Sequence, residues 1–240
     1  QRLIVLAEDI SEMFIRLIGW ILWTAPVGVF ALASPAVAQM GLSLLASLAV
    51  LVVTVVIGLF VFMALFYLTA VRFWGRKGIG QFVRGVAATY VIGFSTTSSV
   101  ASLPVMFQDA ATLGVSPTVS SLVLSLGAAI NRAGSALFQA AAVVFLAALY
   151  GVSLPATALM SAGAVGFLVA MSVAPVPSAS IVTLAPILEV AGVPVAGLGI
   201  LLGIDRIPDM FRSATNITGH VAAAVTVEGM FNVTGNETSF

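Results

Sequence analysis

Charged residues are scarce in this sequence. Asp, Glu, Lys and Arg together make up 8% of its 240 residues, and 60% of the residues are hydrophobic. An average soluble domain is about 25% charged, so this composition excludes that class and predicts a membrane protein. Apolar runs exceed the ~20 residues that a helix needs to cross a bilayer, and the alternating pattern of membrane strands is absent. We therefore expect an all-α protein with several membrane-spanning helices.

Cysteine is absent, and histidine occurs once. The lack of cysteine excludes a disulfide framework, a thiolate metal site and a cysteine nucleophile. Because the sequence offers no nucleophile–base pair, no metal-ligand cluster and no phosphate-binding glycine loop, we expect neither an enzyme nor a bound cofactor. Basic and acidic residues balance at nine each, which argues against a nucleic-acid partner.

The N-terminal third contains two long apolar stretches, Ile15–Ala36 and Leu44–Ala70, and each predicts a span. The chain opens at Gln1 without Met, a signal peptide or a basic leader, so we expect that the start of a longer protein is missing. Four of the nine basic residues lie between Arg72 and Arg84, and the positive-inside rule places this connection on the cytoplasmic side. We expect a multi-pass protein of a bacterial-type inner membrane, surrounded by lipid.

Beyond residue 80 the apolar stretches are interrupted. The polar run Ser95–Ser99 separates two pieces that are too short to span, and this predicts a re-entrant hairpin. Asn131–Gly134 breaks the next apolar stretch in its middle. The same order then repeats, which predicts hairpins over residues 81–114 and 155–191 and broken helices over residues 116–150 and 195–228. Such a repeat is typical of inverted-repeat transporters, whose site lies between the two halves. Two ordinary pairs of kinked helices are the alternative.

The segment Gly203–His220 is the polar centre of the C-terminal half, with four charges in eight residues. Helical spacing places Asp205, Asp209 and Arg212 on one face, which Asn216 extends by a turn. Because a charge inside a bilayer costs about 3 kcal/mol or more, such groups turn inward, form pairs and usually serve function. We therefore predict a buried polar stripe, with an interfacial loop as the alternative.

Three motifs together resemble the glutamate transporter family of dicarboxylate/amino-acid:cation symporters: Gly93–Pro104, Ala129–Ser135 and Gly203–Asn216. Ala25–Ala31 resembles the fifth helix of that family, and the resemblance covers nearly the whole chain in order. It implies an inverted repeat of two re-entrant helical hairpins and two broken helices, assembled as a homotrimer. The implied domains are scaffold and peripheral helices over residues 1–80, a transport core over residues 81–230 and a frayed tail over residues 231–240.

The resemblance also implies a binding site for an acidic amino acid. The positions that match the family's substrate contacts are Ser98, Ser99, Ser135, Val176, Ser180, Asp209, Arg212, Ser213 and Asn216. Asp209 would meet the α-ammonium group, and Arg212, helped by the hydroxyl of Ser135, would pair with the side-chain carboxylate. These roles are physically sensible, because a guanidinium offers a planar fork for a carboxylate and Asp209 offers a counter-charge for an ammonium. Alternatively, Asp209 and Arg212 simply pair with each other.

The remaining contacts involve the hairpin tips. The backbone of Ser98 and Ser99, together with Asn216, would hold the α-carboxylate. Val176 and Ser180 fall at the tip of the second hairpin, which is the gate in that family. This would be a secondary active transporter that works by alternating access. Alternatives are a C4-dicarboxylate carrier of the same fold and a channel-like or non-transporting relative.

The sequence departs from the family at the ion sites. The candidate ion-coupling positions are Gly127, Asn131, Arg132, Asp205 and His220. The family's Asn-Met-Asp-Gly-Thr signature reads Asn131-Arg-Ala-Gly-Ser135 here, so Arg132 adds a guanidinium and Ala133 removes a carboxylate. His220 replaces another aspartate. Sodium prefers hard, anionic oxygen ligands, so we expect weakened sodium sites and either proton-coupled or uncoupled transport. A histidine titrates near pH ~6.5 in water and is one candidate proton carrier, and Asp205 and Asp209 are the others.

Overall fold

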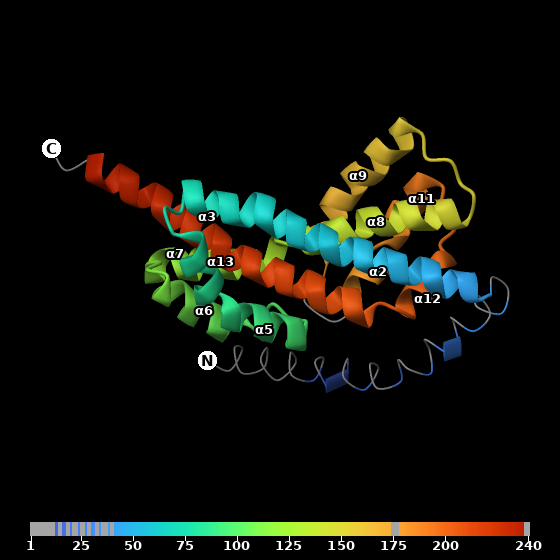
Figure 1. Cartoon of the computed structure of the whole chain (residues 1–240), viewed down its shortest axis with the longest axis horizontal. Helices are drawn as coiled ribbons and strands as arrows, with labels where there is room; N and C mark the ends of the chain where they lie inside the picture. The colour runs from blue at the N-terminus through green and yellow to red at the C-terminus, as the bar shows by residue number, and fades with distance from the viewer. Residues whose placement is uncertain are drawn as a thin grey trace.

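Figure 1 shows the computed structural model of the chain, which describes residues 41–173 and 178–237 together with isolated positions between residues 13 and 38. The predicted first span, Ile15–Ala36, and the predicted gate residue Val176 lie outside the described residues. Every described element is helical. The predicted tail is helical through Glu237, because the last helix continues past residue 231.

The first long element is an apolar rod of three consecutive pieces, α2 (Leu42–Phe62), the π-helical segment η1 (Met63–Leu68) and α3 (Thr69–Phe73). Its stretch Ser43–Phe73 is long and apolar enough to cross a membrane, as the second predicted span requires. The π-helical turns widen the rod near its C-terminal end, a change that frequently accompanies function.

The first predicted hairpin consists of helices of ten residues or fewer, each too short to span: α4 (Ile79–Gly85), α5 (Ala87–Thr96) and α6 (Leu103–Thr112). α5 ends at Thr97, which has a left-handed backbone with φ of 49°. Pro104 lies at the start of α6, where its missing N–H costs no helical hydrogen bond. The chain thus reverses direction at the Ser/Thr run, where the sequence predicts the tip.

The first broken helix follows as α7 (Pro117–Ile130) and α8 (Ala133–Leu149). The break falls at Asn131 and Arg132, as predicted, because Asn131 adopts an extended backbone. α7 begins after Ser116, whose backbone N–H and hydroxyl both donate to the Glu228 carboxylate, at 2.9 and 2.7 Å. The Ser116 hydroxyl also accepts from the backbone N–H of Val119 at 3.4 Å and so caps α7, and Glu228, far along the chain, holds this capping residue in place.

The second half repeats this order. Its hairpin is formed by α9 (Ala156–Ala170), α10 (Ala179–Val182) and α11 (Ala185–Ala191), and its broken helix by α12 (Gly197–Leu202) and α13 (Arg206–Glu237). The break between α12 and α13 falls at Gly203–Asp205, so Asp205 lies just before α13, whereas Asp209 and Arg212 lie within it. Pro208 lies in the first turn of α13, where a proline is tolerated, whereas in the interior it would disrupt the helix.

Two large hydrophobic cores, and a small third one of Leu44, Leu48 and Ile200, hold these elements together. The first joins α2, α8 and the second hairpin and includes Leu51, Val55, Leu59, Phe138, Leu146 and Leu188. The second joins α3, the first hairpin, α7 and α13 and includes Val71, Phe82, Met106, Leu124, Ile217 and Val221. The rod and α13 lie side by side along the molecule (Figure 1).

Glycines permit this close approach of the rod to α13. A Cβ atom at Gly229 would overlap the carbonyl oxygen of Trp74, and one at Gly219 would overlap the hydroxyl of Tyr67. Between membrane helices the hydrophobic effect contributes little, so association depends on close packing at small residues. The fit of the rod against α13 therefore depends on these two glycines.

Candidate functional site

The charged stripe lies inside the protein. Arg212 is fully buried, and Asp205 and Asp209 are only 2% and 4% exposed. Arg212 Nη2 lies 2.7 Å from Asp205 Oδ1 and 3.0 Å from Asp209 Oδ1. The guanidinium carbon lies 4.2 Å from the ring centroid of Phe138, a favourable cation–π arrangement. The three charges that helical spacing predicts on one face are thus brought together around Arg212.

These ion pairs leave polar atoms unsatisfied. In the described part of the chain, Nε and Nη1 of Arg212 and Oδ2 of Asp205 have no hydrogen-bond partner. A buried charged donor without a partner costs on the order of 1–3 kcal/mol or more. A ligand carboxylate that accepted from the guanidinium would remove that cost. The arrangement therefore suits an anionic ligand.

Asn216 fastens the stripe to the start of α8. Its Oδ1 accepts from the backbone N–H of Gly134 at 2.7 Å, and its Nδ2 donates to Ser135 Oγ at 3.1 Å. A Cβ atom at Gly134 would lie 2.7 Å from the carbonyl oxygen of Arg212, so a glycine is needed for this approach. Ser213 is half-buried on the same helix. The predicted partners Ser135, Arg212 and Asn216 are therefore neighbours.

The first hairpin tip is a tightly bonded turn. The hydroxyl of Ser98 accepts from the backbone N–H of Ala101 at 3.3 Å, and its carbonyl accepts from the N–H and hydroxyl of Ser102. Ser99 is buried, and its hydroxyl accepts from Arg132 Nη1 at 2.8 Å. The tip therefore reaches the break between α7 and α8.

The second hairpin is held from two sides. The backbone N–H of Ser178 points to Asp209 Oδ2 at 3.4 Å, from a left-handed backbone with φ of 60°. Ser180 is buried, and its carbonyl accepts from Gln139 Nε2 at 3.0 Å. Sequence reasoning missed Gln139, whose signal was a lone amide within the apolar helix α8.

The candidate ion-coupling residues form two groups. His220 is fully buried against Gly127, with its Nε2 3.4 Å from the carbonyl oxygen of Asn131. Arg132 follows Asn131 directly and donates to the carbonyl oxygen of Ala128, next to Gly127, so it borders this group, whereas Asp205 lies apart and pairs with Arg212. No group of three or more His, Cys, Asp or Glu residues that could hold a metal ion occurs within the described ranges.

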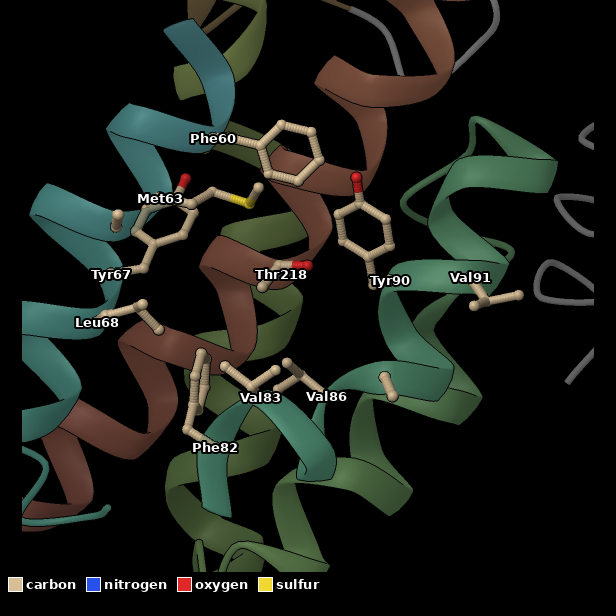
Figure 2. A pocket seen from close by; sticks show the side chains of 12 residues that line it. Phe60, Met63, Tyr67, Leu68, Phe82, Val83, Val86, Tyr90, Val91 and Thr218 are labelled. Atoms are coloured by element: carbon tan, nitrogen blue, oxygen red, sulfur yellow. The ribbon is translucent and has the colours of Figure 1, made fainter. Parts of the chain in front are cut away.

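An apolar groove of about 490 Å³ lies elsewhere, between η1, the first hairpin and α13. Figure 2 shows its lining, where the hydroxyls of Tyr67, Tyr90 and Thr218 are surrounded by aliphatic and aromatic side chains. Its lining residues include none of the charged side chains of the stripe. We therefore assign the candidate site to the stripe and the hairpin tips.

Comparison with known protein families shows to which family the chain belongs. The family model described as the sodium:dicarboxylate symporter family matches residues 1–230. The chain belongs to this family. Its members are transporters, so the expectation that the protein is not an enzyme is confirmed, as is that of an all-α membrane fold.

Curated symporters of this family resemble the chain over most of its length. It is 33% identical over 234 residues to the proton/sodium-glutamate symport protein of Bacillus subtilis, covering 96% of this chain and 54% of that protein. It is 32% identical over 227 residues to the proton/glutamate-aspartate symporter of Escherichia coli, covering 95% and 52%. It is 33% identical over 223 residues to the C4-dicarboxylate transport protein of Laribacter hongkongensis, covering 92% and 50%. The chain thus spans about half the length of these relatives.

Proposed function

We propose that the protein is a secondary active transporter of an acidic amino acid, aspartate or glutamate. It works by alternating access in a bacterial-type inner membrane as a homotrimer, with its site between the two hairpin tips. The observation that carries this proposal is the buried guanidinium of Arg212, which retains unpartnered donors beside two carboxylates. Both hairpin tips reach the same region, through Ser99 and Ser178.

The charges of the site favour an amino acid over a dicarboxylate. The substrate's side-chain carboxylate would accept from Arg212, and its ammonium group would face Asp209. Asp209 then exchanges one cationic partner for another, so that no buried charge is left unpaired. Ser98, Ser99 and Asn216 would hold the α-carboxylate, while Ser180 and Val176 would close the gate. Ser135 on α8 and Ser213 on α13 complete the proposed substrate contacts.

A C4-dicarboxylate is the second candidate substrate. It is favoured by one specific contact, the 3.0 Å pair between Arg212 and Asp209, which neutralises Asp209 without any ammonium group. Relatives named as C4-dicarboxylate transport proteins agree with this reading.

We further propose that transport does not require sodium and is either proton-coupled or uncoupled. The group formed by Gly127, Asn131 and His220 offers carbonyl oxygens and an imidazole, and Ala133 offers no side-chain ligand. Without an anionic oxygen such a group binds sodium weakly. Relatives described as proton symporters make a proton a reasonable alternative ion.

Uptake into proteoliposomes tests the proposal. Labelled aspartate, glutamate and succinate are offered to the reconstituted full-length protein, with sodium and proton gradients imposed separately. We expect saturable uptake of aspartate or glutamate without sodium. Preference for succinate would overturn the substrate, and an absolute need for sodium would overturn the coupling. Binding without uptake would identify a non-transporting relative.

A further inference from the structure

Arg132 contacts three separate parts of the fold. Its Nη1 donates to Ser99 Oγ of the first hairpin tip at 2.8 Å, and its Nε donates to the carbonyl oxygen of Val173, at the start of the second tip, at 3.2 Å. Its Nη2 donates to the carbonyl oxygen of Ala128 at 3.0 Å. The side chain is only 4% exposed. All three nitrogens of the guanidinium are therefore engaged.

The charge of Arg132 is stabilised without a carboxylate. Among the described residues no ion pair of Arg132 occurs, and its acceptors are two backbone carbonyls and one hydroxyl. Ala128 lies in the last turn of α7, whose final carbonyls lack helical partners and carry the negative end of the helix dipole. A fixed cation at this point is therefore favourable, and the rigid fork of arginine can serve several acceptors at once.

Two described residues flank the second tip, whose own residues 174–177 lie outside the described ranges. Val173, before the tip, accepts from Arg132, whereas Ser178, after it, points to Asp209. Asp209 is a proposed substrate contact, so its hold on Ser178 changes when a substrate arrives. Arg132 has no substrate role, so its hold on Val173 does not depend on the substrate. Gln139 also holds the second hairpin, but its hydrogen-bond acceptors, Ser180 and Thr183, lie in that hairpin alone.

We propose that Arg132 is a positioning residue that fastens the two hairpin tips to each other and to the end of α7. The second hairpin then closes over the site without a bound metal cation, because a side chain supplies the positive charge at the junction. The proposal rests on the proposed function only in treating the second hairpin as the gate. In this proposal a residue of the chain, Arg132, keeps the gate in its closed position.

Distance measurements between the tips test this proposal. The chain contains no cysteine, so cysteines placed at Val100 and Met171, which are 54% and 44% exposed, can carry a pair of spin labels. The full-length protein is measured in choline buffer and in sodium buffer, without substrate. With Arg132 intact we expect one short distance in both buffers.

Arg132→Met keeps a long side chain but removes every donor. We expect a second, longer distance, with the open population increased on the order of 10-fold or more by the loss of charge-assisted hydrogen bonds. Arg132→Lys should restore the short distance in part, because it keeps the charge but lacks the fork. Arg206→Met is the matched control, since Arg206 is exposed and its contact with Thr97 is 3.5 Å long.

An unchanged short distance in Arg132→Met would overturn the proposal, as would a wild-type gate that closes only in sodium. If Arg132→Met does not fold, Ser99→Ala decides instead, because it removes only the acceptor on the first tip. A longer distance in that variant supports the fastening, and an unchanged distance contradicts it. The distance measurement involves neither transport nor substrate. If the uptake assay disproves the proposed substrate, the result for Arg132 therefore still stands.

Discussion

Arg212 is the buried charge on which the proposed site depends. Arg212→Ala should abolish binding of aspartate and glutamate, because among the described residues it removes the only guanidinium that pairs with both Asp205 and Asp209. Deleting one partner of a buried charge pair typically costs about 2–5 kcal/mol. Calorimetric titration measures the loss, with the exposed Arg206→Ala as control. Unchanged aspartate affinity in Arg212→Ala would refute the assignment.

Asp209 distinguishes the two candidate substrates. Asp209→Asn should weaken binding of aspartate far more than binding of succinate, because only aspartate carries an ammonium group that needs a counter-charge. The dissociation constants of both ligands are compared in the variant and the parent protein. Equal losses for both would mean that Asp209 serves mainly as the partner of Arg212, with which it pairs at 3.0 Å.

His220 tests the proposed coupling. We expect aspartate to bind when choline replaces sodium, and, if transport is proton-coupled through this residue, binding should vary with pH. In His220→Ala that variation should disappear. Calorimetry at several pH values measures both effects. A strong sodium requirement at every pH would contradict the prediction, and a pH dependence that survives in His220→Ala would point to Asp205 or Asp209.

The helical spacing of Asp205, Asp209 and Arg212 predicted that they form a cluster, because charges within a membrane protein turn inward and form pairs. It could not predict the roles of Gln139 and Val173. A lone amide in an apolar helix does not reveal its partner, and a backbone carbonyl has no sequence signal. The same limit applies to Arg132. The sequence showed that an arginine departs from the family motif here, but it could not show which three acceptors the side chain bonds.

At the scale of the elements, the approach of α8 to α13 depends on Gly134. Gly134→Ala would place a Cβ atom 2.7 Å from a backbone oxygen of Arg212, so the two helices must separate. We expect a loss of about 1–3 kcal/mol of stability, the typical cost of overpacking, together with weaker substrate binding. Thermal unfolding in detergent measures it.

Gly163→Ala is the matched control for that experiment. Gly163 also lies within a helix, but a Cβ atom there would meet nothing within 4 Å. Its replacement should leave stability unchanged or slightly higher, since alanine favours a helix more than glycine does. Equal effects of the two substitutions would show that the approach of α8 to α13 is not tight.

The elements themselves were largely readable from the sequence. Short apolar pieces predicted the hairpin helices, and Asn131 marked the break between α7 and α8. The π-helical turns of η1 could not be foreseen, since their residues read as an ordinary apolar helix and their shape follows from packing against α13.

At the scale of the whole molecule, the rod from α2 to α3 shares both large hydrophobic cores with the hairpins and broken helices. Leu59 belongs to one core and Val71 to the other. The resemblance implies that residues 1–80 are scaffold and peripheral helices. From this packing we instead propose that the rod moves with the transport core.

Spin labels at Leu65 and Met230, which are 61% and 45% exposed, test this proposal. Their distance should stay the same with and without aspartate, because the rod and α13 would move as one body. A change in distance on substrate binding would place a moving boundary near residue 80 instead. The composition of the chain could predict a membrane protein, but it could not predict which spans move together.

The hydrogen bonds from Ser116 to Glu228 have a consequence for how the protein is made. Ser116 emerges from the ribosome 112 residues before the carboxylate that binds its N–H and hydroxyl. Gly134 likewise waits 82 residues for Asn216. Until the last helix has entered the membrane, these polar groups have no protein partner and are costly to bury. The two halves therefore close late in synthesis, and a chain that stops before Glu228 would present unsatisfied polar groups to the proteases that remove incomplete membrane proteins.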